Sequence, residues 1–298
     1  MENSKLMTDG VTIENEHLKV TIKEKGAELK SVINKETGLE YMWNGDPAFW
    51  GKTSPILFPI VGTLKKDTYN YKNKSYSLTR HGFAREATFQ ITTQRKDCVI
   101  FSLSSTPASL QKYPFNFELK VEYRLMRNNL EVSYVVTNGA TDDLYFSIGG
   151  HPAFKVPLLE GTTYEDYYLE FDKEENSGRW PISPEGLIEE RAVPFLKNSS
   201  ILKLTRGLFN NDALVFKDVK SKKISIKSAM HLHGLDFYFS DFPYLGIWAA
   251  KNADFVCIEP WCGIADSVLH DQQLVSKEGI VKIFKDESWT RIWKVRPF

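Results

Sequence analysis

The sequence predicts an all-β protein, a sandwich or barrel of antiparallel strands with few short helices. Three observations support this prediction. Apolar residues alternate with polar residues over many short runs, turn-forming residues separate several of these runs, and helical periodicity is scarce. Successive side chains of a strand point to opposite faces, so alternation with a period of two marks a strand with one buried face.

The expected elements follow one another along the chain. Two hairpins are predicted, one at Met126-Arg127-Asn128-Asn129 and one at Asn73-Lys74, because each short polar stretch separates two alternating runs. Short helices are expected at 107–112 and 263–269. Alternation predicts strands around 18–22, 69–71, 76–78, 99–103, 117–125, 130–136, 224–226, 235–239 and 290–295.

The organisation of the chain indicates one domain over residues 1–298. A length of 298 residues fits either one large all-β domain or two ordinary domains. No internal repeat, low-complexity tract or linker rich in proline, glycine or serine divides the sequence. Three distinctive motifs extend from position 80 to position 261, and a single site built from all three requires one domain.

Composition excludes several classes of protein. The 38 Lys and Arg residues balance 38 Asp and Glu residues, which argues against a duplex nucleic-acid partner. The N-terminal residues lack the apolar run of a signal peptide, and no stretch is long enough to predict a membrane span. Three cysteines give no disulfide framework, so a reducing, cytoplasmic setting is the default expectation. The sequence leaves the oligomeric state open.

Two imidazoles and one carboxylate occur in the three motifs Arg80–Arg85 (RHGFAR), Gly149–Phe154 (GGHPAF) and Ile258–Trp261 (IEPW). His151 and Glu259 each precede a proline, which favours an extended backbone at both residues. Proline donates no ladder hydrogen bond, so a strand tends to stop there. We therefore expect both side chains at strand ends, held on a backbone with little freedom.

The residue types suit proton transfer on a carbohydrate. A carboxylate is ionised at neutral pH, whereas an imidazole can hold or release a proton. Such a pair can remove a proton at one end of a substrate and supply one at the other. Trp261 offers a flat apolar face for a sugar ring. No metal, nucleotide or other cofactor is needed for this chemistry.

The motifs, in this order and together with Phe58-Pro59-Ile60-Val61-Gly62, resemble those of the aldose 1-epimerase (galactose mutarotase-like) superfamily, which includes hexose-6-phosphate epimerases. The resemblance extends from about Val11 to the C-terminus. It implies a large antiparallel β-supersandwich and a cofactor-free interconversion of the α and β anomers of a small-molecule sugar.

The resemblance also implies roles for individual residues. Glu259 would be the general base at the C1 hydroxyl, and His151 the general acid at the ring oxygen. His81 would bind the substrate near the ring oxygen, and Asp212 would accept hydrogen bonds from sugar hydroxyls. Many relatives carry an arginine shortly after the glycine matching Gly62, where this chain has Thr63. The candidates to replace its charge are Lys65, Arg80 and Arg85.

Other interpretations remain open from the sequence. His81 and Trp261 can serve packing, and Asp212 can cap a turn. A non-catalytic sugar-binding protein on the same scaffold needs no titrating pair. A cupin-type metal enzyme would use His231 and His233, but no Glu follows them at suitable spacing and the next histidine is His270, which favours a polar strand face. A glycosidase is disfavoured because it usually needs two flanking carboxylates. Glucose, galactose and a hexose 6-phosphate all remain possible substrates.

Overall fold

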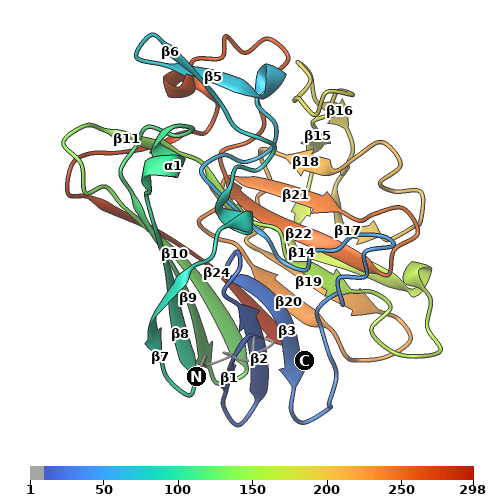
Figure 1. Ribbon diagram of the computed structural model, residues 1–298. Helices are drawn as coiled ribbons and strands as arrows, with labels where there is room; N and C mark the ends of the chain where they lie inside the picture. Colours follow the sequence, from blue (N-terminus) through green and yellow to red (C-terminus); the bar gives the residue numbers. More distant parts are fainter. Residues whose placement is uncertain (1–9) are drawn as a thin grey trace.

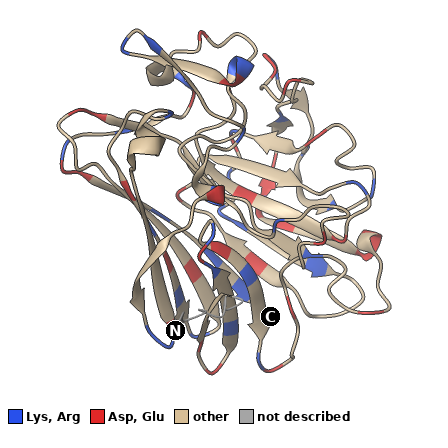
Figure 2. Ribbon diagram, in the orientation of Figure 1, with Lys and Arg blue, Asp and Glu red and all other residues tan. Residues whose placement is uncertain are grey.

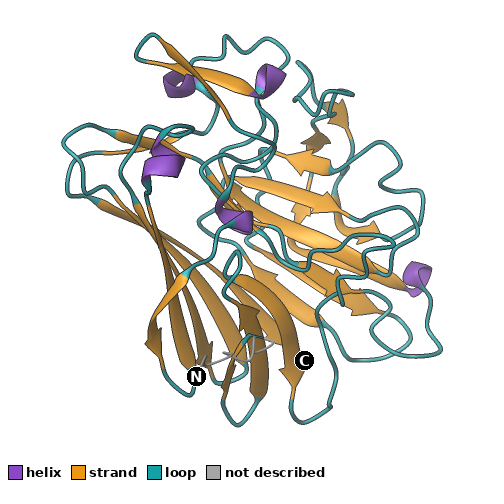
Figure 3. Cartoon of the chain, in the orientation of Figure 1, coloured by secondary structure: helices purple, strands orange, loops and turns teal. Residues whose placement is uncertain are grey.

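The computed structural model describes residues 10–298, which form antiparallel sheets with little helix (Figures 1 and 3). Helical structure in this part of the chain is limited to α1 (Pro107–Leu110) and four single 3-10 turns. The predicted all-β, antiparallel class is thus confirmed. No helix among these residues is long and apolar enough to cross a membrane. Acidic and basic residues are interspersed over the ribbon (Figure 2).

A nine-stranded sheet runs through the molecule. Its strands β10 (Asn129–Thr137) and β24 (Ser288–Pro297) pair over eight residues, and in each the apolar alternation places one row of side chains in the core. In spatial order its strands are β17 (Ser199–Lys203), β14 (Tyr167–Glu175), β19 (Lys223–Ser228), β20 (Leu235–Tyr238), β24 (Ser288–Pro297), β10 (Asn129–Thr137), β9 (Glu118–Met126), β8 (Cys98–Ser104) and β7 (Gln90–Gln94).

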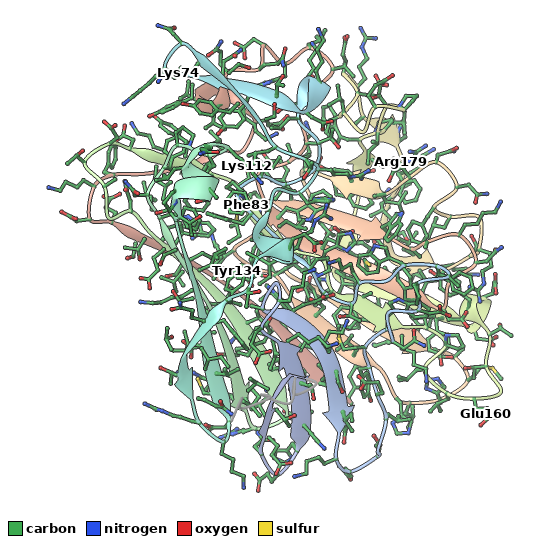
Figure 4. The ribbon with its side chains drawn as sticks, in the orientation of Figure 1. Lys74, Phe83, Lys112, Tyr134, Glu160 and Arg179 are labelled. Carbon is green, nitrogen blue, oxygen red and sulfur yellow. The ribbon has the colours of Figure 1, made fainter. Side chains whose placement is uncertain are left out.

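A six-stranded sheet packs against the nine-stranded one. Its order is β18 (Leu214–Phe216), β21 (Tyr244–Trp248), β22 (Phe255–Cys262), β12 (Ile148–Gly150) and β4 (Ile56–Leu57), and β13 (Ala153–Lys155) also pairs with β22. The rings of Phe154 on β13 and Phe237 on β20 lie 5.7 Å apart between the two sheets. Figure 4 shows side chains filling the interior, with Tyr134 of β10 labelled. The sheets therefore share one core.

Four smaller sheets complete the described part of the fold. The hydroxyl of Tyr123 on β9 donates to the carbonyl of Ala27, which ties the sheet β1–β3 to the nine-stranded sheet. The small sheets are β1 (Val11–Glu14) with β2 (Leu18–Lys23) and β3 (Glu28–Asn34), β5 (Thr68–Tyr71) with β6 (Lys74–Ser77), β11 (Leu144–Phe146) with β23 (Val281–Ile283), and β15 (Gly178–Arg179) with β16 (Val193–Pro194).

Local predictions were mostly confirmed. Met126 pairs with Asn129 across the hairpin between β9 and β10, as expected. The hairpin between β5 and β6 turns one residue earlier than predicted, at Lys72 and Asn73. Their positive φ values of 48° and 61° suit a tight type I′ turn.

The helix predicted at 263–269 is wrong. Gly263 has a φ of 96°, outside the helical region. The backbone of Asp266 instead bonds to two distant segments, since its N–H donates to the carbonyl of Thr63 and its carbonyl accepts from the N–H of Ile188. Backbone groups that make these bonds cannot form the hydrogen bonds of a helix.

Candidate active site

The site is built at an interruption in the six-stranded sheet. β12 ends at Gly150 and β13 begins at Ala153, and both pair with β22. His151 and Pro152 form the step between them. The expectation that His151 lies at a strand end is confirmed, because β12 stops one residue earlier.

Glu259 does not lie at a strand end, because β22 continues through Pro260 to Cys262. The Ile258 N–H donates to the carbonyl of Pro152, on the side of the interruption. Residues two apart in a strand point their N–H groups the same way, so the nitrogen of Pro260 faces this side too. The missing donor of Pro260 falls where the ladder is already broken, which explains why the strand tolerates it.

Alternation along β22 sorts its side chains onto two faces. Val256, Ile258 and Cys262 join the main core. Cys257, Glu259 and Trp261 point to the opposite face, on the side of His151. Both faces are covered, since every residue of β22 is buried. A strand buried on both faces carries an almost continuous apolar run, and Glu259 stands out in it as a carboxylate.

The imidazole of His151 and the carboxylate of Glu259 are neighbours. His151 Nε2 lies 3.3 Å from Glu259 Oε2, and the two side chains are 10% and 2% exposed. Glu259 Oε2 nevertheless has no hydrogen-bond partner, and neither does His151 Nδ1. Each side chain therefore keeps an atom without a hydrogen-bond partner, and both groups remain available to a ligand.

A cavity of about 450 Å³ opens onto this pair. Its volume lies in the range of about 300–1,000 Å³ that is usual for small-molecule sites. Seven of the eight residues proposed from the sequence line it: Arg80, His81, Arg85, His151, Asp212, Glu259 and Trp261. The lining residues that sequence reasoning missed include Trp50, Ile182, Ile188, Val215 and Trp248.

Aromatic rings enclose the imidazole of His151. The ring of Trp50 stacks on it at 4.8 Å between centroids and 29° between planes. Trp248 meets it edge-on at 5.7 Å, and His81 does so at 5.9 Å. Trp50 is itself anchored, because its carbonyl accepts a hydrogen bond from Trp43 Nε1 at 2.9 Å. These contacts fix the plane of His151 without occupying its ring nitrogens.

The proton position on His81 follows from its backbone contact. The Gly62 N–H donates to His81 Nδ1 at 3.1 Å, so this nitrogen carries no proton. Burial, followed by the neighbouring His151, Arg80 and Arg85, lowers the pKa of His81 well below its usual value. Neutral His81 therefore carries its proton on Nε2 and can donate one hydrogen bond to a ligand.

Trp261 lies flat against the sheet because its neighbours are glycines. A Cβ on Gly149 of β12 would lie 2.6 Å from its ring, and one on Gly246 of β21 would lie 2.5 Å from it. The indole is 6% exposed, and its Nε1 has no partner. Trp261 thus contributes both an apolar wall and an unused donor to the cavity.

Polar groups of two other segments complete the cavity wall. Asp212 adopts a positive φ of 72° and accepts a hydrogen bond from the N–H of Ala213 at 2.7 Å. Its Oδ1 lies 4.0 Å from Arg80 Nη2. Arg85 Nη2 donates to the carbonyl of Arg80 at 2.8 Å, which holds the two arginines in one turn.

Lys65 is the predicted residue that the structure does not bring to the cavity. Its ammonium donates to the carbonyls of Val268 and His270, at 2.8 and 3.2 Å. Its N–H donates to Asp266 Oδ2, and Asp266 Oδ1 pairs with Lys277 Nζ at 2.7 Å, with neither side chain exposed. The half-buried Lys65 side chain therefore binds backbone carbonyls, and its N–H contributes to the buried Asp266–Lys277 ion pair.

Burial shifts the pKa values of the central pair toward the neutral forms. It raises the pKa of Glu259 well above its usual value, and the charge of Arg80 offsets this only in part. It lowers the pKa of His151 to about 3. Two groups in such close contact titrate as a unit, and burial favours the uncharged forms of that unit.

Unsatisfied polar atoms concentrate at this one cavity. Seven buried side-chain nitrogen or oxygen atoms lack a hydrogen-bond partner among residues 10–298. Four of them belong to residues lining the cavity, namely Arg85, His151, Glu259 and Trp261. Because buried polar groups are normally paired, this concentration indicates a site built to receive a polar ligand.

The histidine pair His231 and His233 is not part of this site. The two residues lie in a loop rather than on the strand face that was expected. His231 Nε2 hydrogen-bonds the hydroxyl of Tyr167 at 2.8 Å, which gives it a structural partner. The side chains that could hold a metal ion in the described part of the chain are instead His151, Cys257 and Glu259.

Comparison with known proteins gives consistent results. A family model described as aldose 1-epimerase matches residues 9–281. The chain is 36% identical over 282 residues to the chromosomally encoded protein LacX of Lactococcus lactis subsp. lactis, covering 92% of this chain and 94% of LacX. Among solved structures, a galactose mutarotase related enzyme from Lactobacillus acidophilus superimposes with a TM-score of 0.92 at 34% identity, with 97% of each chain covered. A galactose mutarotase-like protein from Lactobacillus casei superimposes with a TM-score of 0.91 at 32% identity, covering 97% of this chain and 99% of that one.

Proposed function

The chain belongs to the aldose 1-epimerase family, and we propose that it interconverts the α and β anomers of a hexose by acid–base opening and closing of the sugar ring. The observation that carries the proposal is the pair of His151 and Glu259, 3.3 Å apart at the wall of a cavity and without saturating partners.

The proposed reaction moves two protons. Glu259 removes the proton of the C1 hydroxyl while the bond between C1 and the ring oxygen breaks and the C1 carbonyl forms. His151 gives its proton to the ring oxygen. Rotation about the C1–C2 bond then presents the other face of the carbonyl, and closure with the two roles reversed yields the other anomer.

The charges of the pair change during the opening step. The reactive form of the pair is a carboxylate beside an imidazolium, and both become neutral when the ring opens. Low local polarity raises the free energy of the two charges, so the cost of forming this pair is recovered in the step that removes them. Holding both groups against one substrate accelerates the reaction relative to water, because the acid and the base are already oriented toward the reacting atoms.

The other lining residues have supporting roles in this proposal. His81 donates from Nε2 near the ring oxygen, and Asp212 accepts from a sugar hydroxyl. Arg80 and Arg85 bind substrate oxygens, and Trp261 faces the ring. The two arginines are compatible with either a hydroxyl or a phosphate, so the substrate class proposed is a hexose, free or phosphorylated. The three buried free thiols fit a cytoplasmic location.

The test follows the optical rotation of freshly dissolved α-D-glucose and α-D-galactose against the spontaneous rate. Anomer exchange of glucose 6-phosphate and galactose 6-phosphate is measured by NMR. Acceleration of at least one sugar, abolished in Glu259→Gln, supports the proposal. Tight binding of a sugar without acceleration of any of the four would replace it with a sugar-binding function.

A further inference from the structure

Cys257 is a buried thiol that the proposed reaction does not use. It is fully buried and lies two residues before Glu259 on β22, so the two side chains share one face of the strand. Across the interruption, His151 faces both. One ligand atom from each of these three side chains lies within 4.8 Å of the other two. An imidazole, a thiol and a carboxylate thus converge on one point at the wall of the cavity.

From this convergence we propose that His151, Cys257 and Glu259 bind a thiophilic divalent cation such as Zn²⁺, and that the bound cation blocks turnover. Zn²⁺ accepts nitrogen, sulfur and oxygen ligands at about 2.0–2.3 Å, and a site with three protein ligands keeps a fourth position open. His151 and Glu259 both line the cavity, so the open position would be reached from there.

The geometry needs little adjustment to hold the ion. Tetrahedral ligands at those bond lengths are separated by about 3.3–3.7 Å. His151 Nε2 and Glu259 Oε2 already lie 3.3 Å apart. Glu259 Oε2 has no competing hydrogen bond, so binding a cation there breaks none. The separations to the Cys257 Sγ are at most 4.8 Å, so they need to shorten by no more than about 1.5 Å to complete the set.

Charge balance also fits a divalent ion. Without metal, burial and then the charge of Glu259 raise the pKa of the Cys257 thiol well above its usual value. Binding displaces the proton of this thiol and any proton that the His151–Glu259 pair holds, and the released protons pass to solvent. The resulting thiolate and carboxylate neutralise the cation, which removes the usual penalty of an unpaired buried charge.

Inhibition follows from the same atoms. A cation on Glu259 and His151 occupies the lone pairs that the proposed base and acid need. The epimerase reaction and the metal site therefore share two residues, whereas Cys257 belongs to the metal site alone and does not line the cavity.

The test uses two probes on the full-length protein. Cd²⁺ titration followed by ultraviolet absorbance detects a thiolate-to-metal charge-transfer band without any need for turnover. Inhibition by Zn²⁺ and its reversal by a chelator are measured on the sugar found to be the substrate. Each variant is compared with its own metal-free rate.

Cys262→Ala is the matched control, because Cys262 is a buried free thiol on the same strand but in the opposite core. We expect one Cd²⁺ band in the wild type and in Cys262→Ala, and no band in Cys257→Ala. The Zn²⁺ concentration for half inhibition should rise at least about tenfold in Cys257→Ala.

Two results would overturn the proposal: no Cd²⁺ band in the wild type, or a band that persists in Cys257→Ala. The first needs no variant, so a folding defect in Cys257→Ala leaves the proposal testable, and Cys257→Ser provides a second variant of similar size. Because the band does not depend on catalysis, failure of the metal site and failure of the epimerase proposal are distinguishable.

Discussion

Trp50 is expected to position His151 rather than to bind the sugar directly. Its ring stacks on the imidazole at 4.8 Å and 29°, and Trp248 contributes the other aromatic wall. Trp50→Ala removes the stacked ring and lets the imidazole rotate. Stacked aromatic pairs contribute about 0.5–1.5 kcal/mol beyond area burial. If this energy serves to hold the reactive orientation, kcat falls by about 2- to 13-fold, at about 1.36 kcal/mol for each tenfold.

The assay is steady-state anomer exchange with kcat and KM determined separately. Trp50→Phe keeps a ring at this position and should recover most of kcat. Phe49→Ala is the control in the same loop, because Phe49 packs edge-on against Trp43 and is 46% exposed. A rise in KM at unchanged kcat in Trp50→Ala would refute the positioning role and make Trp50 a substrate-binding platform.

Three further outcomes are expected. Glu259→Gln should lower kcat by about 10²–10⁴-fold at an unchanged melting temperature, since the carboxylate lacks a hydrogen-bond partner on Oε2; a collapsed melting temperature would indicate a structural role. Arg80→Ala should raise KM, whereas Lys65→Ala should lower stability and leave KM unchanged, because only Arg80 lines the cavity; steady-state kinetics and thermal melts separate the two. Burial raises the pKa of Asp266, but the neighbouring His270, the charge and hydrogen bond of Lys277 and the N–H of Lys65 outweigh burial and hold it at about 2, below the ordinary 3.8. The resulting stability, about 2 kcal/mol, is present above pH 4 and lost as pH falls toward 2. Urea unfolding of the wild type and Asp266→Asn at pH 7 and pH 2.5 measures the difference between their free energies of unfolding. A difference that is as large at pH 2.5 as at pH 7 contradicts the assignment.

The sheet architecture was largely readable from the sequence because period-two alternation reports which strand face is buried. The runs at 117–125 and 130–136 became β9 and β10 with the expected hairpin between them. Alternation is a local property of the sequence, so it can be recognised without knowing which strands pair with one another. The helix expected at 263–269 failed because distant backbone groups of Thr63 and Ile188 claim its hydrogen bonds.

The strand-end prediction succeeded for His151 and failed for Glu259 for one physical reason. A proline ends a strand only where its missing N–H would have been needed. Pro152 follows β12 directly, whereas the nitrogen of Pro260 faces the gap that His151 and Pro152 create. The position of this gap depends on how β12, β13 and β22 pair, and a local sequence pattern does not predict that pairing.

The motif residues were predictable as a set, but their surroundings were not. Trp50 and Cys257 carry no motif of their own, and only the folded chain places them beside His151 and Glu259. Lys65 was a reasonable cation candidate by sequence proximity, yet its side chain turns to backbone carbonyls instead. The single-domain organisation and the roles of the site residues stay predictions.

The most direct test of the central claim is NMR exchange between the α and β anomers of each candidate hexose, with wild-type protein, His151→Asn and Glu259→Gln at equal concentration. The account predicts wild-type exchange far above the spontaneous rate for at least one sugar, and a loss of that acceleration in both folded variants. Wild-type exchange at the spontaneous rate for every hexose and hexose 6-phosphate, or full acceleration in either variant, would contradict it.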